Sequence, residues 1–166
     1  MPASDQGINL ERYMLIPRTL IFLTRGDKVL LLKGSKNKRL WPGQYNGIGG
    51  HVEQGEDIYT AAQRELLEET GLESINLWLI GIITVDTQTN PGVCIYVFRG
   101  ECIHAEPIPS TEGLLEWVEI SDLTHLPLVL DLLVLLPKIL KMKLGEPPFS
   151  AHSHYDETGN LLVNFV

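Results

Sequence analysis

Residues 50–72 read GHVEQGEDIYTAAQRELLEETGL, and no other part of the chain is as informative. The segment starts within a Gly-Gly pair, passes through a short acidic loop and enters an expected helix of residues 58–70. Asp57 has a side chain that is preferred at a helix N-cap, and Gly71 stands where a glycine stop is expected. Apolar residues recur at i, i+3 and i+7, so the helix has one apolar stripe: Tyr59, Ala62 and Leu66.

Three glutamates crowd one face of this helix, away from the stripe: Glu65, Glu68 and Glu69. Like charges at these spacings repel one another, so something must offset the repulsion. A hard divalent cation such as Mg²⁺ or Mn²⁺ would do so, because it takes oxygen ligands and keeps positions open for water and phosphate. Taken alone, the glutamate run favours the commoner alternative, a solvated acidic helix face.

The whole 50–72 segment resembles, position for position, the Nudix box, the signature of MutT-type hydrolases of nucleoside diphosphates linked to another group. The segment fills every defined position of that pattern without an insertion: Gly50, Glu56, Arg64, Glu65, Leu66, Glu68, Glu69, Gly71 and Leu72. The resemblance implies a loop–helix–loop that binds Mg²⁺, with Mn²⁺ as the alternative, and the diphosphate of a substrate.

The resemblance also implies residue roles within the box. Glu65, Glu68 and Glu69 would be metal ligands, together with Gly50. Glu56 would orient water or the Arg64 guanidinium. Arg64 has a structural alternative as well, as a clamp that neutralises the carboxylates. The expected catalytic residues are Glu56, Arg64, Glu65, Glu68 and Glu69.

Length and charge restrict the class of protein. With 166 residues, 44% of them hydrophobic, we expect one domain over residues 1–166 with its own core. The net charge of -8 argues against general binding to nucleic-acid backbones. It does not argue against a small nucleotide, because a metal site can supply positive charge locally.

Three further features of the sequence bear on the cellular location of the protein. The longest apolar stretch, residues 126–136, is too short for a bilayer and contains Asp131, and residues 1–7 do not resemble a signal peptide. Cys94 and Cys102 are poorly placed to pair, and two free thiols fit a reducing compartment. We therefore expect a cytoplasmic monomer or homodimer with no nucleic-acid or membrane partner.

The remaining pattern alternates between strands and helices. We expect strands at residues 13–24, 29–33, 75–86, 93–101 and 114–120, and a closing hairpin at 149–156 and 161–166. Residues 126–143 are expected to be helical, and Pro137 to kink or break that helix. The fold class is thus α/β. The resemblance makes it a Nudix-type α/β/α sandwich with a mixed sheet.

The loop before the box is basic and carries an aromatic ring: Lys36, Lys38, Arg39 and Trp41. It is either a solvated loop or a mouth over the substrate, where the ring would stack and the cations would bind phosphates. The stretch 41–56 resembles the purine nucleoside triphosphate branch of the family, which implies that Asn46 lies in the base pocket. His51 and Lys33 are assigned to substrate binding with it.

Two acids outside the box complete the predicted set. Glu112 lies in a segment similar to the one that holds a loop glutamate reaching the metal in the family, and Glu116 is the second choice. Asp131 lies among leucines, where a lone acid is costly without a partner. Its segment resembles the late helix of 8-oxo-purine triphosphate hydrolases, which implies a contact with the purine edge. The alternative is an Asp131 side chain turned to solvent.

The resulting hypothesis is Mg²⁺-dependent hydrolysis of a purine nucleoside triphosphate, such as 8-oxo-dGTP, to the monophosphate and pyrophosphate. Hydrolysis of another diphosphate, such as ADP-ribose or a dinucleoside polyphosphate, is the enzymatic alternative. A non-catalytic nucleotide sensor is the alternative from a different class, but a pure binder has no need of the full box. His152 and His154 share one side of a strand and are interpreted as surface or partly buried histidines rather than a metal pair.

Overall fold

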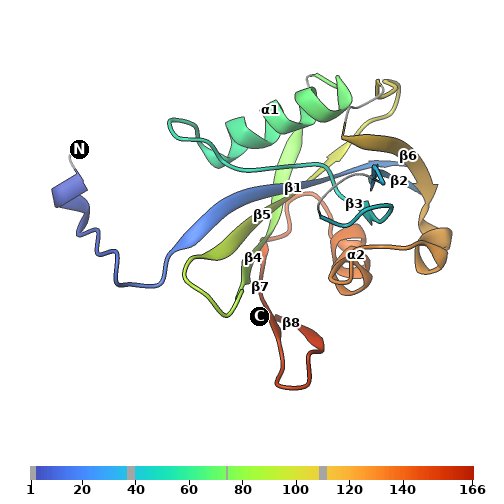
Figure 1. Ribbon diagram of the computed structural model, residues 1–166. Helices are drawn as coiled ribbons and strands as arrows, with labels where there is room; N and C mark the ends of the chain where they lie inside the picture. The colour runs from blue at the N-terminus through green and yellow to red at the C-terminus, as the bar shows by residue number, and fades with distance from the viewer. Residues whose placement is uncertain (1–2, 37–39, 74, 109–111) are drawn as a thin grey trace.

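The computed structural model describes residues 3–36, 40–73, 75–108 and 112–166, and in them an eight-stranded sheet is covered by α1 on one face and α2 on the other (Figure 1). Lys38 and Arg39 of the predicted basic mouth lie outside these residues. The elements in chain order are η1 (Ala3–Gln6), β1 (Leu15–Arg25), β2 (Lys28–Gly34), β3 (Tyr45–Asn46), α1 (Ile58–Thr70), β4 (Leu77–Val85), β5 (Gly92–Glu101), β6 (Gly113–Glu119), η2 (Ile120–His125), α2 (Leu132–Lys141), β7 (Phe149–Tyr155) and β8 (Leu161–Phe165).

The sheet is mixed, as predicted. Its order is β3-β2-β1-β5-β4-β7-β8, and β6 pairs with β2 outside this path. β1 runs parallel to β5, from Leu15 opposite Gly92 to Thr24 opposite Glu101, and β4 runs parallel to β7. The remaining pairs are antiparallel. The closing hairpin is confirmed by the pairing of β7 with β8.

Alternation along β1 divides the apolar core into two layers. Ile21 and Leu23 pack towards α1, together with Ala62 and Leu66 of that helix. Leu20 and Phe22 face the opposite way. They pack with the buried residues of α2, which are Leu132, Leu135, Leu136 and Ile139. The period of two along this strand therefore decides which side chains can reach each face.

The helix α1 has the predicted bounds because its end signals are unambiguous. The Asp57 carboxylate accepts the backbone N–H of Tyr59 at 2.8 Å and of Thr60 at 3.0 Å. Gly71 adopts φ 68°, a left-handed conformation that suits glycine, and its N–H bonds to the Leu67 carbonyl. Tyr59 departs from the predicted stripe, since it is 42% exposed and only its ring edge meets Phe98.

The second helix is shorter than the predicted segment of residues 126–143. It spans only Leu132–Lys141. The preceding backbone joins the sheet edge instead, because Tyr45 N–H bonds to the Pro127 carbonyl at 2.9 Å and Val129 N–H to the Tyr45 carbonyl at 3.0 Å. Of the two predicted effects of Pro137, a kink or a break, the break is wrong, since α2 continues through this residue. The carbonyl left without an intrahelical partner is that of Leu133, on an exposed side of the helix.

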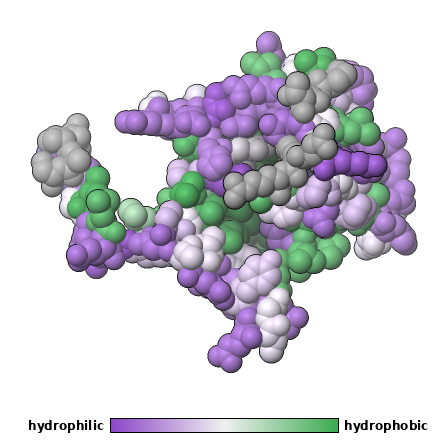
Figure 2. Space-filling model, viewed as in Figure 1, coloured by the Kyte–Doolittle hydropathy of each residue, from purple (hydrophilic) through white to green (hydrophobic). Residues whose placement is uncertain are grey.

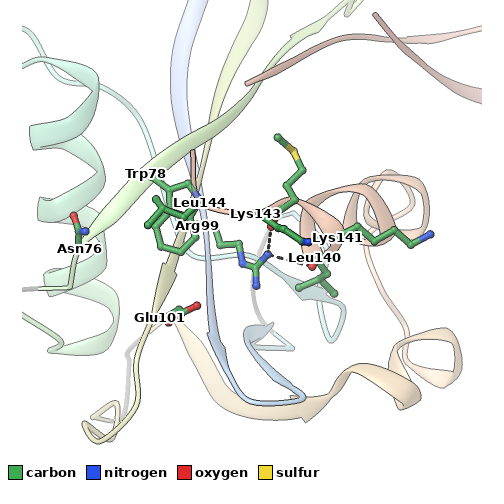
Figure 3. Close-up of a pocket in the computed structure, with 9 residues that line it drawn as sticks. Asn76, Trp78, Arg99, Glu101, Leu140, Lys141, Lys143 and Leu144 are labelled. Atoms are coloured by element: carbon green, nitrogen blue, oxygen red, sulfur yellow. Dashed lines mark hydrogen bonds between the residues drawn. The ribbon is translucent and has the colours of Figure 1, made fainter. Parts of the chain in front are cut away.

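The C-terminal end of α2 is held by an arginine from the sheet. Arg99 of β5 donates to the carbonyls of Leu140 at 3.1 Å and Met142 at 2.6 Å, so a cation lies where the helix dipole is negative. Figure 3 shows this contact beside a cavity of about 470 Å³, from which the Lys141 side chain points away. Burial lowers the pKa of Arg99. The contact fixes one end of α2, and Asp131 lies directly before the other end.

Three further predictions concern residues away from the box. Cys94 and Cys102 are both free and buried. The rings of His152 and His154 stack with their centroids 4.8 Å apart, and His152 is exposed. Among the described residues, no helix has both the length and the apolar character needed to cross a membrane.

Candidate active site

Arg64 is the centre of an ion-pair cluster on α1. Its Nε and Nη2 donate to the two carboxylate oxygens of Glu56, at 3.1 and 2.7 Å. Its Nη1 donates to Glu65 at 2.8 Å and lies 3.3 Å from Glu68. Nη2 also donates to the backbone carbonyl of His51 at 2.9 Å, which ties the acidic loop to the helix. One guanidinium thus contacts three carboxylates of the 50–72 segment and offsets part of their charge.

These contacts shift the pKa values of the partners in opposite directions. The hydrogen bond from Arg64 lowers the pKa of Glu56, and the Glu53 backbone N–H, 2.7 Å from Glu56 Oε1, lowers it further. Glu56 and then Glu65 raise the pKa of Arg64. Both shifts favour the charged forms of Glu56 and Arg64.

Glu69 occupies a different environment from its neighbour Glu68. The Glu69 residue is only 8% exposed and its Oε2 accepts the backbone N–H of Gly49 at 3.2 Å, whereas the Glu68 side chain is 60% exposed. Gly50, which follows Gly49, allows the Glu65 carboxylate to pack directly against the loop backbone. A Cβ at Gly50 would lie 2.4 Å from Glu65 Oε1, so only glycine permits this approach.

The donor chemistry of this helix face fits a hard divalent cation. Glu65, Glu68 and Glu69 supply carboxylate oxygens, and the nearby Gly50 carbonyl already accepts the Thr19 N–H at 2.8 Å. Within the described residues, however, no three His, Cys, Asp or Glu side chains are arranged to hold a metal ion. In the structure Glu65 and Glu68 pair with Arg64 instead.

Two adjoining cavities lie next to the box, and together we call them the crevice. The larger, of about 320 Å³, is lined at one end by Glu69 and Glu112. The smaller, of about 70 Å³, is lined by Val129 and Asp131. Both cavities share the lining residues Arg18, Trp41, Asn46, Gly47 and Gly49. In Figure 2 the outer surface of α1 is hydrophilic, whereas apolar residues show in the hollow beneath it. The crevice therefore connects one box carboxylate, that of Glu69, to the predicted base-pocket residues Asn46 and Asp131.

Asp131 is the least satisfied acid of the crevice. Its Oδ1 is buried and has no hydrogen-bond partner among the described residues. Burial raises the pKa of this carboxyl group, and the backbone N–H groups at the start of α2 offset only part of the effect. The expected alternative, a side chain turned to solvent, does not fit this burial. A buried acceptor without a partner is costly, so a donor from a ligand would be stabilised there.

Among the predicted residues, those of the box other than Glu69 do not line the crevice: Gly50, His51, Glu56, Arg64, Glu65 and Glu68. Lys33 and Glu116 do not line it either. The Lys33 ammonium lies 5.0 Å from the Tyr45 ring centre, and the Tyr45 hydroxyl donates to Glu116 at 2.5 Å. Burial, and then this hydrogen bond, raise the pKa of Tyr45 to about 12. His51 is exposed and meets the site only through its backbone carbonyl.

Sequence reasoning missed Arg18, which lines both cavities from β1. The signal was available, since Arg18 is a charged residue two positions before an apolar strand core. Trp41 was expected over the substrate and does line the crevice, with an unusual positive φ of 50° that turns the loop there. The sequence does not show such a backbone conformation in a non-glycine residue.

Comparison with known proteins places these features in a family. The family model described as "NUDIX domain" matches residues 14–139. The chain is 30% identical over 145 residues to the oxidized purine nucleoside triphosphate hydrolase of Mus musculus, covering 87% of this chain and 89% of that protein. It is 34% identical over 137 residues to the protein of the same name in Danio rerio, covering 81% and 86%.

More distant similarity is found to a larger relative and to a solved structure. The NAD-capped RNA hydrolase NudC of Pseudomonas aeruginosa is 32% identical over 115 residues, which are 68% of this chain but 39% of that protein. The crystal structure of the mutator MutT protein from Bacillus halodurans superposes with a TM-score of 0.75 at 25% identity, covering 91% of this chain and 97% of that one. With most of its length matched by the family model and by full-length relatives, the chain belongs to the NUDIX domain family.

Proposed function

We propose that this chain hydrolyses a purine nucleoside triphosphate, with 8-oxo-dGTP as the leading candidate, to the nucleoside monophosphate and pyrophosphate. The observation that carries the proposal is the crevice. It has box carboxylate Glu69 at one end and Asp131 at the other, with Asn46 lining both cavities. The names of the relatives from Mus musculus and Danio rerio support the same substrate class.

The box end would handle the phosphates with Mg²⁺, or with Mn²⁺ in its place. Glu65, Glu68 and Glu69, with the Gly50 carbonyl and Glu112, would hold the metal. When bound, the metal supplies positive charge to the phosphate oxygens and acidifies a water molecule. Arg64 and Glu56 keep the carboxylates oriented, because their paired hydrogen bonds fix the guanidinium between the loop and the helix.

The base end would select the purine. Asn46 offers a donor and an acceptor from one amide, although its Oδ1 accepts the Gly47 N–H at 2.8 Å, so the amide NH₂ group faces the remaining partners. Asp131 offers a buried oxygen without a partner. Trp41 supplies an exposed aromatic ring beside both, which suits stacking on a base. Lys33 and His51 are proposed only as outer contacts, since neither lines the crevice.

The setting of this activity is part of the proposal. The free thiols of Cys94 and Cys102 support a reducing compartment such as the cytoplasm. A small nucleotide is proposed as the partner, and the protein as a monomer or homodimer that binds neither nucleic acid nor membrane. Residues 1–166 are proposed to form one Nudix domain.

A substrate panel tests the proposal. Purified protein with Mg²⁺ is mixed with 8-oxo-dGTP, dGTP, dCTP, ADP-ribose and a dinucleoside polyphosphate, and pyrophosphate and orthophosphate are measured separately. We expect pyrophosphate from the purine triphosphates, loss of turnover in EDTA, and recovery when Mg²⁺ or Mn²⁺ is added. Glu69→Gln serves as the control for contaminating hydrolases.

Three outcomes would contradict the proposal. Higher catalytic efficiency on ADP-ribose or the dinucleoside compound would assign the other enzymatic function. Nucleotide binding without turnover of any compound would indicate a sensor. Full activity in metal-free protein would remove the role of the box carboxylates.

A further inference from the structure

Arg18 is the only basic side chain among the described residues that line the crevice. Three acids line the same cavities: Glu69, Glu112 and Asp131. A nucleoside triphosphate carries several negative charges, so cationic groups along the crevice would favour its binding. A metal at the box end would supply positive charge at that end. Among the described lining residues, Arg18 is the one that can supply it between Glu69 and Asp131.

The guanidinium of Arg18 has no hydrogen bond, ion pair or ring contact with any described residue, unlike three other arginines of the chain. Arg25 pairs with Glu106, Arg64 with the box carboxylates, and Arg99 with the end of α2. Arg18 is nonetheless partly buried. A partly buried guanidinium without a partner gains more from an anionic ligand than a paired one, because no existing contact is lost.

The position of Arg18 in β1 directs its side chain to the base end. Arg18 precedes Leu20 and Phe22 by two and four residues, so it leaves the sheet on the face of the α2 layer, where Asp131 lies. Its backbone, however, bridges to His51 beside the box. The side chain thus starts near the phosphate end and lies along the wall that both cavities share.

We infer that Arg18 is a substrate-binding residue for the phosphate nearest the nucleoside, between the metal-held phosphates and the base. The inference rests on the proposed function, because it assumes that a nucleotide lies along the crevice. A guanidinium suits this task, since two parallel N–H groups match two phosphate oxygens. Arg18 would also remain available after the terminal phosphates leave, so it should bind the monophosphate product without metal.

Product binding in EDTA tests the inference independently of catalysis. Calorimetry compares dGMP, dCMP and deoxyguanosine on wild type, Arg18→Ala and Arg18→Lys, with Arg12→Ala as the control because Arg12 is an exposed arginine outside the crevice. Arg18→Ala should weaken dGMP and dCMP alike by roughly tenfold to a hundredfold, the range for a hydrogen bond to a charged group. Arg18→Lys should fall between, since it keeps the charge but loses the paired geometry. Deoxyguanosine affinity should not change.

Unchanged monophosphate affinity in a folded Arg18→Ala variant would overturn the inference. So would a loss that extends to deoxyguanosine, which would place the contact on the base. Wild type that binds dGMP no better than deoxyguanosine would overturn it as well, because the phosphate would then add nothing. Turnover of triphosphates by the same wild-type preparation separates these results from a failure of the proposed function.

Discussion

Arg64 and Glu56 form a two-pronged ion pair across the turn from the acidic loop into α1, with Nε 3.1 Å and Nη2 2.7 Å from the two carboxylate oxygens. The same guanidinium holds Glu65 at 2.8 Å. One arginine therefore fixes the positions of several box carboxylates relative to one another. If Glu65 and Glu68 bind a metal, as proposed, they would have to give up part of their contact with Arg64.

The first prediction is that Arg64→Lys lowers kcat/KM by about 10²-fold, the cost of roughly 1 Å of misplacement in a catalytic group. Lysine keeps the charge but has no planar fork to hold Glu56 and Glu65 together. Steady-state kinetics with a purine triphosphate measures the effect. Arg25→Lys is the matched control, since Arg25 pairs with Glu106 outside the crevice. Equal rates in Arg64→Lys and wild type would show that the fork has no part in catalysis.

Removing the charge of a proposed metal ligand should lower activity more than the Arg64→Lys change, which only disturbs the orientation of these carboxylates. Glu68→Gln and Glu69→Gln keep side-chain size, and each should lower kcat by roughly two to four orders of magnitude, as for a lost transition-state electrostatic contact. Glu68→Gln should change thermal stability little without metal, because its 3.3 Å ion pair with Arg64 is on a side chain that is 60% exposed, and exposed ion pairs contribute little. Glu73→Gln, an exposed acid just after α1, is the control. Near wild-type rates in both variants would refute the metal-ligand assignment.

The substitution Gly50→Ala, which adds one methyl group, should lower activity without preventing folding. The added Cβ of Gly50→Ala would lie 2.4 Å from Glu65 Oε1, so the carboxylate must move away from the loop. We expect a folded protein whose activity falls about as far as that of Glu65→Gln. Kinetics and circular dichroism of both variants measure this. Wild-type activity in Gly50→Ala would show that the Glu65 carboxylate does not need to pack on the loop.

The raised pKa of Asp131 has a consequence for stability. Because the folded state holds this proton more tightly than the unfolded chain, Asp131 costs no stability below its unfolded pKa of about 3.9, and the cost grows as pH rises through the folded pKa. Asp131→Asn should therefore match wild type at low pH and melt higher at pH 7. An increase of about 2–4 °C would correspond to about 1 kcal/mol for a domain of this size.

Thermal melts from pH 3 to pH 8 test this dependence. Asp122→Asn, which alters an exposed acid on η2, is the matched control and should show no such trend. If Asp131→Asn shifts the melting temperature equally at all pH values, the effect is not due to ionisation of Asp131.

The box helix could be predicted to the residue because its end signals are local. Asp57 caps the start and Gly71 ends it, and both act through bonds within a few residues. The bounds of α2 could not be predicted in this way. Val129 belongs to an apolar run that is compatible with a helix. Its N–H, however, bonds to the carbonyl of Tyr45, which is so distant in sequence that no local pattern indicates the contact.

The site residues within the box could be predicted from their spacing in the sequence. The residues that only the tertiary fold brings together could not be predicted in this way. Asn46 and Asp131 line the same small cavity although they are far apart in sequence. Lys33 does not line the crevice, which strand alternation explains. Its neighbour Leu32 lines the crevice, so Lys33 points to the opposite face and meets Tyr45. Arg18 lies on the same face of β1 as Leu20 and Phe22, so strand alternation indicates its position as well.

In the proposed function the two ends of the crevice have different roles, with phosphates bound at the box and the base at Asp131. The most direct test is the ratio of catalytic efficiencies for 8-oxo-dGTP, dGTP and dCTP in wild type and Asp131→Ala. We predict a strong loss for the preferred purine and little change for dCTP, because the phosphate-binding groups are untouched. An unchanged ratio, with the fold intact by circular dichroism, would contradict the account and place base recognition elsewhere.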